Sequence, residues 1–170
     1  IYVVGDTSGG LGSYSNSGSE DLFLIKYNSS GNLQWTQQMG TFSNDVAFDV
    51  ATDSSGNSYV TGYTGTSLDG NTHSGELDLF LVKYDSNGNK SWSKQLGTST
   101  SDYARGVSVD ADGNVSFTGY TTAALDGQTH YGSDYLYLVK YKSLGTRLRN
   151  RQIGTSTLHR SVDSVSNKHM

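Results

Sequence analysis

Short runs of apolar and aromatic residues interrupt a polar chain, and one of these runs occurs three times. Residues 22–27, 79–84 and 136–141 read LFLIKY, LFLVKY and LYLVKY, and the starts of successive runs lie 57 residues apart. Each run opens with consecutive apolar residues, which is typical of a strand covered on both faces. A fixed period of this length predicts one supersecondary unit that is copied along the chain and buries its apolar faces against neighbouring copies.

Each copy is expected to contain four strands, here called a to d, with strand d surrounding a tryptophan (Trp35 and Trp92). The expected ranges are 46–53 and 103–110 for strand a, 1–7, 58–64 and 115–121 for strand b, and the three apolar runs for strand c. Turns such as residues 54–57 (SSGN) are rich in residues that accept a positive φ. The pattern therefore predicts an antiparallel four-stranded meander in each copy.

Repeated four-stranded meanders make up the blades of a β-propeller. We expect an all-β fold, a β-propeller built from four-stranded antiparallel blades in three repeats. The expected boundaries are 1–44 for repeat 1 (strands b to d), 45–101 for repeat 2, 102–158 for repeat 3 and 159–170 for a degenerate tail. A parallel β-helix has a much shorter period, and a sandwich gives no reason for turns to recur in register.

Composition narrows the possible partners and chemistry. The 170 residues include 21 glycines and no cysteine, so disulfides and thiol chemistry are excluded. A formal charge of −4 supplies no basic field for DNA or RNA. No apolar stretch approaches the roughly 20 residues that span a bilayer. The chain opens inside a strand-like pattern at Ile1 rather than in a secretory signal, and we expect it to be a processed or excised piece.

Several motifs recur at one spacing and carry a resemblance to a known family. They are DYA at 102–104, VDADGN at 109–114, TGYT at 118–121, LVKY at 81–84 and GNKSW at 88–92. Together they resemble the bacterial β-propeller repeat family called SBBP, over nearly the whole chain to about Tyr141. The resemblance implies a propeller in a bacterial secreted or cell-surface protein. It implies no common catalytic activity.

Three repeats are too few to close a ring, because propellers usually have about four to eight blades. The first repeat also lacks strand a. Two explanations stay open: two copies form a homo-oligomeric six-bladed ring by exchanging strands, or the chain is part of a larger propeller. In either case we expect that a free, open, three-bladed monomer does not persist.

The third repeat departs from the other two. Arg149 stands where Trp35 and Trp92 stand in the earlier copies, and four of the five arginines lie between residues 147 and 160. One interpretation is a basic binding edge. Others are an outermost strand whose charges block edge-to-edge pairing, or a disrupted reading frame.

The long b–c loops are the best candidates to carry function, because they are expected on one face together with the d–a loops that hold Asp45 and Asp102. The candidate ligand-binding residues are Asp69, Asn71 and His73 in repeat 2, and Asp126, Gln128, His130 and Tyr131 in repeat 3. A metal site at Asp69 and His73 would have only two ligands per loop, too few to fill a coordination sphere. We expect no metal and no other cofactor.

Two further functional classes can be weighed from the sequence. Tyrosines at 14, 63, 120 and 131, beside polar loop residues, could stack on sugar rings in a carbohydrate site; the alternative is that they pack between blades. The chain has no Gly-x-Ser-x-Gly elbow and no carboxylate pair at a distinctive spacing, so we expect no enzyme.

The favoured hypothesis is a non-enzymatic interaction or structural module that presents its b–c loops to a protein partner or to itself. A carbohydrate-binding propeller with repeated weak sites is the alternative. For the packing, Phe23, Phe80 and Tyr137 share one position of strand c and are expected to be buried between blades.

Overall fold

Strands and short turns make up the regular structure of the chain in a computed structural model, which describes residues 1–127 and 134–153. The first sheet holds β1 (Tyr2–Thr7), β2 (Asp21–Tyr27) and β3 (Leu33–Met39). The second holds β4 (Asp45–Thr52), β5 (Ser58–Thr64), β6 (Asp78–Tyr84) and β7 (Lys90–Leu96). The third holds β8 (Asp102–Val109), β9 (Val115–Thr121), β10 (Tyr135–Tyr141) and β11 (Arg147–Ile153). Two short 3-10 turns, η1 (Leu68–Gly70) and η2 (Leu125–Gly127), follow β5 and β9.

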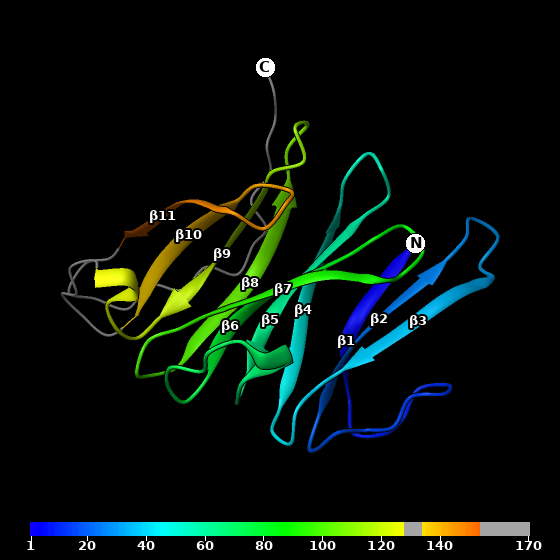
Figure 1. Ribbon diagram of the computed structural model, residues 1–170, viewed down its shortest axis with the longest axis horizontal. Helices are drawn as coiled ribbons and strands as arrows, with labels where there is room; N and C mark the ends of the chain where they lie inside the picture. Colours follow the sequence, from blue (N-terminus) through cyan, green and yellow to red (C-terminus); the bar gives the residue numbers. More distant parts are fainter. Residues whose placement is uncertain (128–133, 154–170) are drawn as a thin grey trace.

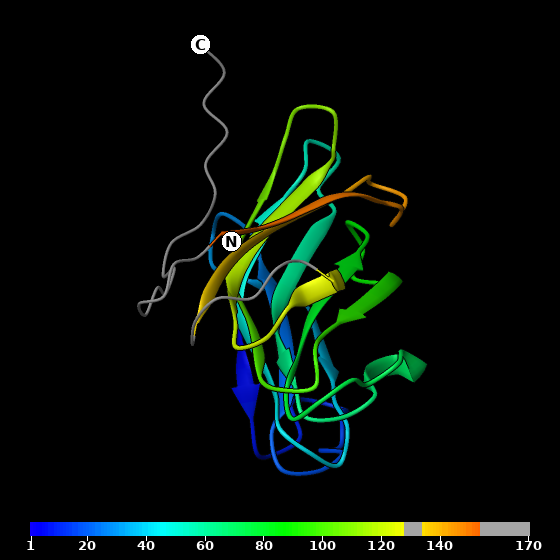
Figure 2. The same cartoon turned by 90° about the vertical axis from the view of Figure 1, so that its left-hand side faces the viewer.

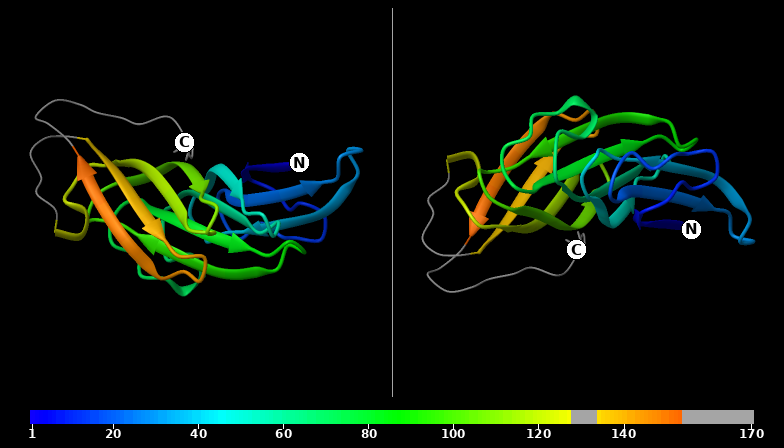
Figure 3. Two further views of the ribbon diagram at one scale, coloured as in Figure 1. Left: turned by 90° about the horizontal axis from the view of Figure 1, so that it is seen from above. Right: turned by 90° about the horizontal axis from the view of Figure 1, so that it is seen from below.

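Every strand pairing within these sheets is antiparallel, and each sheet is a meander in chain order. The predicted all-β fold of antiparallel sheets is thereby confirmed. The sheets lie side by side, with β4–β7 between the other two (Figures 1 and 3). Strand β4 packs against β1 on one side and β8 on the other. The described sheets do not close a ring, and the blade number stays a prediction.

One layer of apolar side chains fills each of the two joints between neighbouring sheets. Because side chains alternate along a strand, β6 sends Phe80 and Val82 into the joint with the first sheet. It sends Leu79 and Leu81 into the joint with the third sheet. All four are fully buried, which explains why strand c reads as an unbroken apolar run.

The outer sheets have only one covered face each. Phe80 and Tyr137 are buried as expected, with 0% and 2% exposure, but Phe23 is only partly buried. In β2 it is Leu22 and Leu24 that pack toward the second sheet, so Phe23 lies on the opposite face. The prediction that all three aromatic rings are buried between blades is therefore wrong for Phe23.

A lysine and a tryptophan lock each joint at its outer rim. Lys26 Nζ and Trp35 Nε1 both donate to the carbonyl oxygen of Ser86, in the β6–β7 turn of the next sheet, at 2.9 and 3.3 Å. The Trp35 ring also lies on Gly88, which has a φ of 88° and leaves no room for a Cβ.

The next joint repeats this lock with equivalent residues. Lys83 Nζ and Trp92 Nε1 donate to the carbonyl oxygen of Ser143 at 3.0 and 3.1 Å, and the Trp92 ring lies beside Gly145. The recurring lysine and tryptophan therefore have a structural role in joining sheets.

Replacing Phe80 by Ala is expected to lower the free energy of unfolding by about 3–5 kcal/mol, because the change empties a fully buried site. Phe23→Ala is the matched control, since it deletes the same ring from a partly exposed site. It should cost less than half as much in a urea titration. Equal losses for the two variants would contradict the packing described above.

Candidate functional site

The long b–c loops and the starts of strands β4 and β8 meet at one end of the sheets. The amide N–H of Asp45 donates to the carbonyl of Glu20 at 2.8 Å, and that of Asp102 donates to the carbonyl of Leu77 at 2.7 Å. Each bond joins the loop of one sheet to the first strand of the next. The face expected from the sequence is therefore assembled from successive sheets, and we call it the loop face.

A glutamine on the outer strand of each sheet holds the loop of that sheet. These residues are Gln38 on β3, Gln95 on β7 and Gln152 on β11. Their Oε1 atoms accept the amide N–H groups of Leu11, Leu68 and Leu125 at 2.8, 2.9 and 2.9 Å. Their Nε2 atoms donate to the carbonyls of Gly9, Thr66 and Ala123 at 3.2, 3.0 and 3.1 Å. The first residues of all three b–c loops are thus held by one repeated clamp, which the sequence analysis missed.

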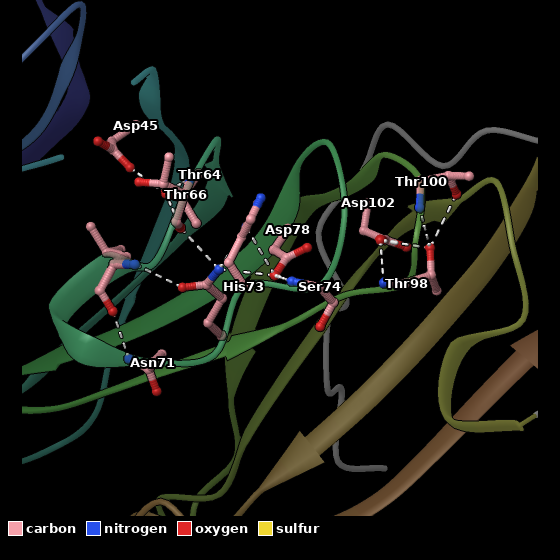
Figure 4. A network of polar contacts seen from close by, with 12 residues as sticks. Asp45, Thr64, Thr66, Asn71, His73, Ser74, Asp78, Thr98, Thr100 and Asp102 are labelled. Atoms are coloured by element: carbon pink, nitrogen blue, oxygen red, sulfur yellow. Dashed lines mark hydrogen bonds and ion pairs between the residues drawn. The ribbon is translucent and has the colours of Figure 1, made fainter. Parts of the chain in front are cut away.

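Two of the clamps extend to a buried aspartate at the first residue of strand c. The Nε2 atoms of Gln38 and Gln95 donate to Oδ2 of Asp21 and Asp78, each at 2.9 Å. Asp78 also accepts the Ser74 amide at 2.8 Å, and His73 Nδ1 lies 3.3 Å from the same oxygen. Figure 4 shows the contacts of Asp78 with Ser74 and His73. The equivalent position in the third sheet is Tyr135.

The three candidates in the second b–c loop are engaged within their own sheet. Asp69 pairs with Lys90 and accepts the Ser93 hydroxyl at 2.6 Å. Asn71 Nδ2 donates to the Leu68 carbonyl and to Ser93 Oγ, both at 2.9 Å. His73 lies 3.3 Å from Gln95 Nε2. These contacts shape the loop, and a direct role of the three side chains in ligand binding stays a prediction.

Asp69 has an uncommon backbone conformation and a lowered side-chain pKa. Its φ of 55° falls in the left-handed region, where Gly12 stands in the first repeat with a φ of 63°. Partial burial alone would raise the pKa of Asp69, but hydrogen bonds from Lys90 and Ser93, with the Lys90 charge, hold that pKa below 3.8. Asp69 is therefore ionised and paired at neutral pH.

The candidates in the third loop lie largely outside the described residues. This applies to Gln128, His130 and Tyr131 and to the side chain of Asp126, whose backbone belongs to η2. Within residues 1–127 and 134–153, no group of three His, Cys, Asp or Glu side chains gathers to hold a metal ion.

Asp45 and Asp102 are buried beneath the loop face. Oδ2 of Asp45 accepts the amide and hydroxyl of Thr41 at 2.5 and 2.7 Å, and Oδ2 of Asp102 accepts those of Thr98 at 2.6 and 2.9 Å. Burial raises the pKa of both carboxyls above 3.8, although the threonine hydrogen bonds offset part of the rise. The negative charge of Asp78 raises the pKa of Asp102 further.

Tyrosines considered for sugar stacking are packed against other side chains. Tyr63 lies 5.3 Å from Tyr103 in an edge-on arrangement, and Tyr120 stacks on Tyr103 at 4.8 Å. Arg105 lies 4.0 Å from the centre of the Phe48 ring and donates to the Tyr120 hydroxyl at 3.1 Å. This cluster matches the packing alternative for Tyr63 and Tyr120.

The comparisons with known proteins agree with this architecture. The family model SBBP, described as a beta-propeller repeat, matches residues 34–69 and 91–125. A protein described as an uncharacterized WD repeat-containing protein, from Acanthamoeba polyphaga mimivirus, is 27% identical over 136 residues. The match covers 69% of this chain and 10% of that relative, so the chain spans about a tenth of its length. Among the described residues, no helix has the length and apolar character to cross a membrane.

Gln95→Ala is expected to loosen the second b–c loop, because the Leu68 amide loses its acceptor and Asp78 loses a donor. Hydrogen exchange of Leu68 should rise, with a loss of about 1–3 kcal/mol in unfolding free energy. Gln34→Ala is the control, since Gln34 is exposed and bonds only to neighbouring backbone. Unchanged exchange at Leu68 in Gln95→Ala would contradict the clamp.

Asp102→Asn and Asp53→Asn are expected to change the pH dependence of stability in opposite directions. The pKa of folded Asp102 is raised, so its ionisation weakens the fold and stability rises as pH falls from 7 toward about 3.8. Burial would raise the pKa of Asp53 too, but hydrogen bonds from Asn57 and Tyr59 lower it below 3.8. The stabilisation that ionised Asp53 gives to the fold is present above pH 3.8 and is lost as the pH falls below that value.

Urea titrations from pH 3 to 7 test these signs, because each substitution removes one contribution. Asp102→Asn should lose stability relative to the parent on acidification toward pH 4, and Asp53→Asn should show a weaker acid loss than the parent. The same slope in both variants and the parent would contradict the assignments.

Proposed function

This chain carries repeats of the SBBP beta-propeller family, and from that premise we propose that it is a non-enzymatic interaction module which binds a protein partner through its loop face. The family and the WD-repeat relative support a repeat-based scaffold. By the same resemblance we assign the module to a bacterial secreted or cell-surface protein.

The observation that carries the proposal is the repeated glutamine clamp. Gln38, Gln95 and Gln152 hold the first residues of three b–c loops in the same way at one end of three neighbouring sheets. A surface whose backbone is already fixed loses less conformational entropy when a partner binds. The loop face is therefore suited to recognition by shape and polar contacts over several blades.

The engagement of the loop side chains supports binding rather than catalysis. Asp69 is paired with Lys90, and His73 lies against the buried Asp78. Catalytic acids and bases need access to a reacting group. The described loop side chains instead stabilise the loop on which they stand.

Self-association is part of the proposal, since each outer sheet has an uncovered face. Val3 and Ile1 in the first sheet and Leu138 and Ile153 in the third are exposed apolar residues. Exposed apolar faces beside sheet edges are usually covered in stable proteins. A second copy, or further blades of a larger propeller, would cover the face of the first sheet.

A photo-cross-linking amino acid tests the loop face when it replaces Thr72, an exposed residue of the second b–c loop. The matched control carries it at Ser55, an exposed residue of the β4–β5 turn at the opposite end of the sheet. In cells of the source organism we expect protein adducts from position 72 and few from position 55. Equal labelling at both sites would contradict the proposal.

A glycan array with the purified chain separates the carbohydrate alternative. Binding to defined glycans that is weakened by loss of the Tyr14 hydroxyl, which donates to Gln37 at 2.9 Å, would favour a lectin-like module instead. We expect no glycan binding and protein adducts at position 72.

A further inference from the structure

The outer face of the third sheet carries a hollow between its last two strands. It has a volume of about 530 Å³ and is lined by Leu138 and Lys140 of β10 and by Leu148, Arg149 and Arg151 of β11. Figure 2 views the molecule from the side of this sheet. Leu138 and Leu148 are 38% and 46% exposed, so the hollow has apolar walls open to solvent.

In the second sheet, the equivalent face packs against the sheet that follows it. There, Trp92 and Lys94 pack on the turn around Gly145 of the next sheet. The equivalent residues of the third sheet are Arg149 and Arg151. An arginine lacks the broad indole surface of tryptophan, so the third sheet cannot hold a following sheet in the same way.

The remaining part of the lock has also changed. Lys26 and Lys83 reach across their joints to a backbone carbonyl. Lys140 instead pairs with Asp110 of its own sheet at 2.8 Å. On this face the tryptophan of the lock is replaced by Arg149, and the lysine is engaged within its own sheet.

The charge of the hollow is opposite to that of the whole chain. Three of the five arginines lie on β11, although the formal net charge is −4. Arg149 and Arg151 are exposed, and among the described residues neither has a carboxylate within ion-pair distance. A guanidinium group matches a carboxylate with two parallel hydrogen bonds.

From these features we infer that the hollow binds an acidic segment of a partner protein. Leucine-sized side chains of the segment lie against Leu138 and Leu148, and its carboxylates pair with Arg149 and Arg151. The apolar walls and the net negative charge of the chain disfavour a nucleic-acid backbone as the occupant.

A second copy of the chain is a poorer match by charge. Strands β1–β3 contain only two acidic residues, Asp6 and Asp21. Asp21 is buried, and Asp6 is paired with Leu22, whose side chain faces the second sheet. The uncovered face of the first sheet therefore offers no accessible strand carboxylate to the two arginines.

A blocked peptide Glu-Leu-Glu-Leu-Glu, titrated into the isotope-labelled chain, probes the hollow by NMR. We expect shifts of the β10 and β11 amides and at least a tenfold weaker affinity for the double variant Arg149→Gln, Arg151→Gln. Arg147→Gln is the control, since it removes one arginine charge from β11 outside the hollow, and it should bind within twofold of the parent. The peptide Gln-Leu-Gln-Leu-Gln should bind at least tenfold more weakly.

Several results would overturn the inference. They are no binding at millimolar peptide, equal binding of the glutamine peptide, unchanged affinity in the double variant, or shifts confined to the loop face. Dimerisation that the double variant abolishes would assign the hollow to a second copy instead. The peptide titration is read on β10 and β11. A negative result would therefore leave the proposed binding at the loop face, which the cross-linking at Thr72 tests, unaffected.

Discussion

The fold depends on the contact between neighbouring sheets, since no single sheet can bury both faces of its central strand. Phe80 and Val82 need the first sheet, whereas Leu79 and Leu81 need the third. At the rim, a lysine and a tryptophan hold the backbone of the next sheet by a shared carbonyl. Apolar burial thus supplies most of the stabilisation, and the polar lock orients one sheet on the next.

The positions of the loops on the loop face depend on the packing of these sheets. The start of each b–c loop is clamped to its own outer strand by a glutamine, and in the first two sheets the last loop residue bonds to the first strand of the following sheet. The loops therefore keep their positions only while the sheets stay packed. The outer face of the third sheet is a different kind of surface, because Arg149 and Arg151 stand where packing residues stand in the second sheet.

Strands were predictable because their signals are local. The alternating and unbroken apolar runs located strand c and its burial from residues 79–84 alone. The partial exposure of Phe23 was not predictable, because the residues directly beside Phe23 and Phe80 are the same. The two positions differ in that no described sheet covers the outer face of the first sheet. Gln95 was missed because a glutamine on an outer strand is unremarkable in isolation. Its recurrence at the same period, as Gln38 and Gln152, was the one available signal.

The lysine and tryptophan of the lock donate to a backbone carbonyl, which every residue type provides. The turn that offers this carbonyl reads Asp-Ser-Asn-Gly at 85–88 and Lys-Ser-Leu-Gly at 142–145, yet the two joints have the same geometry. The glycine under the tryptophan ring is sterically constrained. Mutation can therefore alter the charge and polarity of this turn without separating the blades, so duplicated copies are free to diverge at this rim while remaining joined.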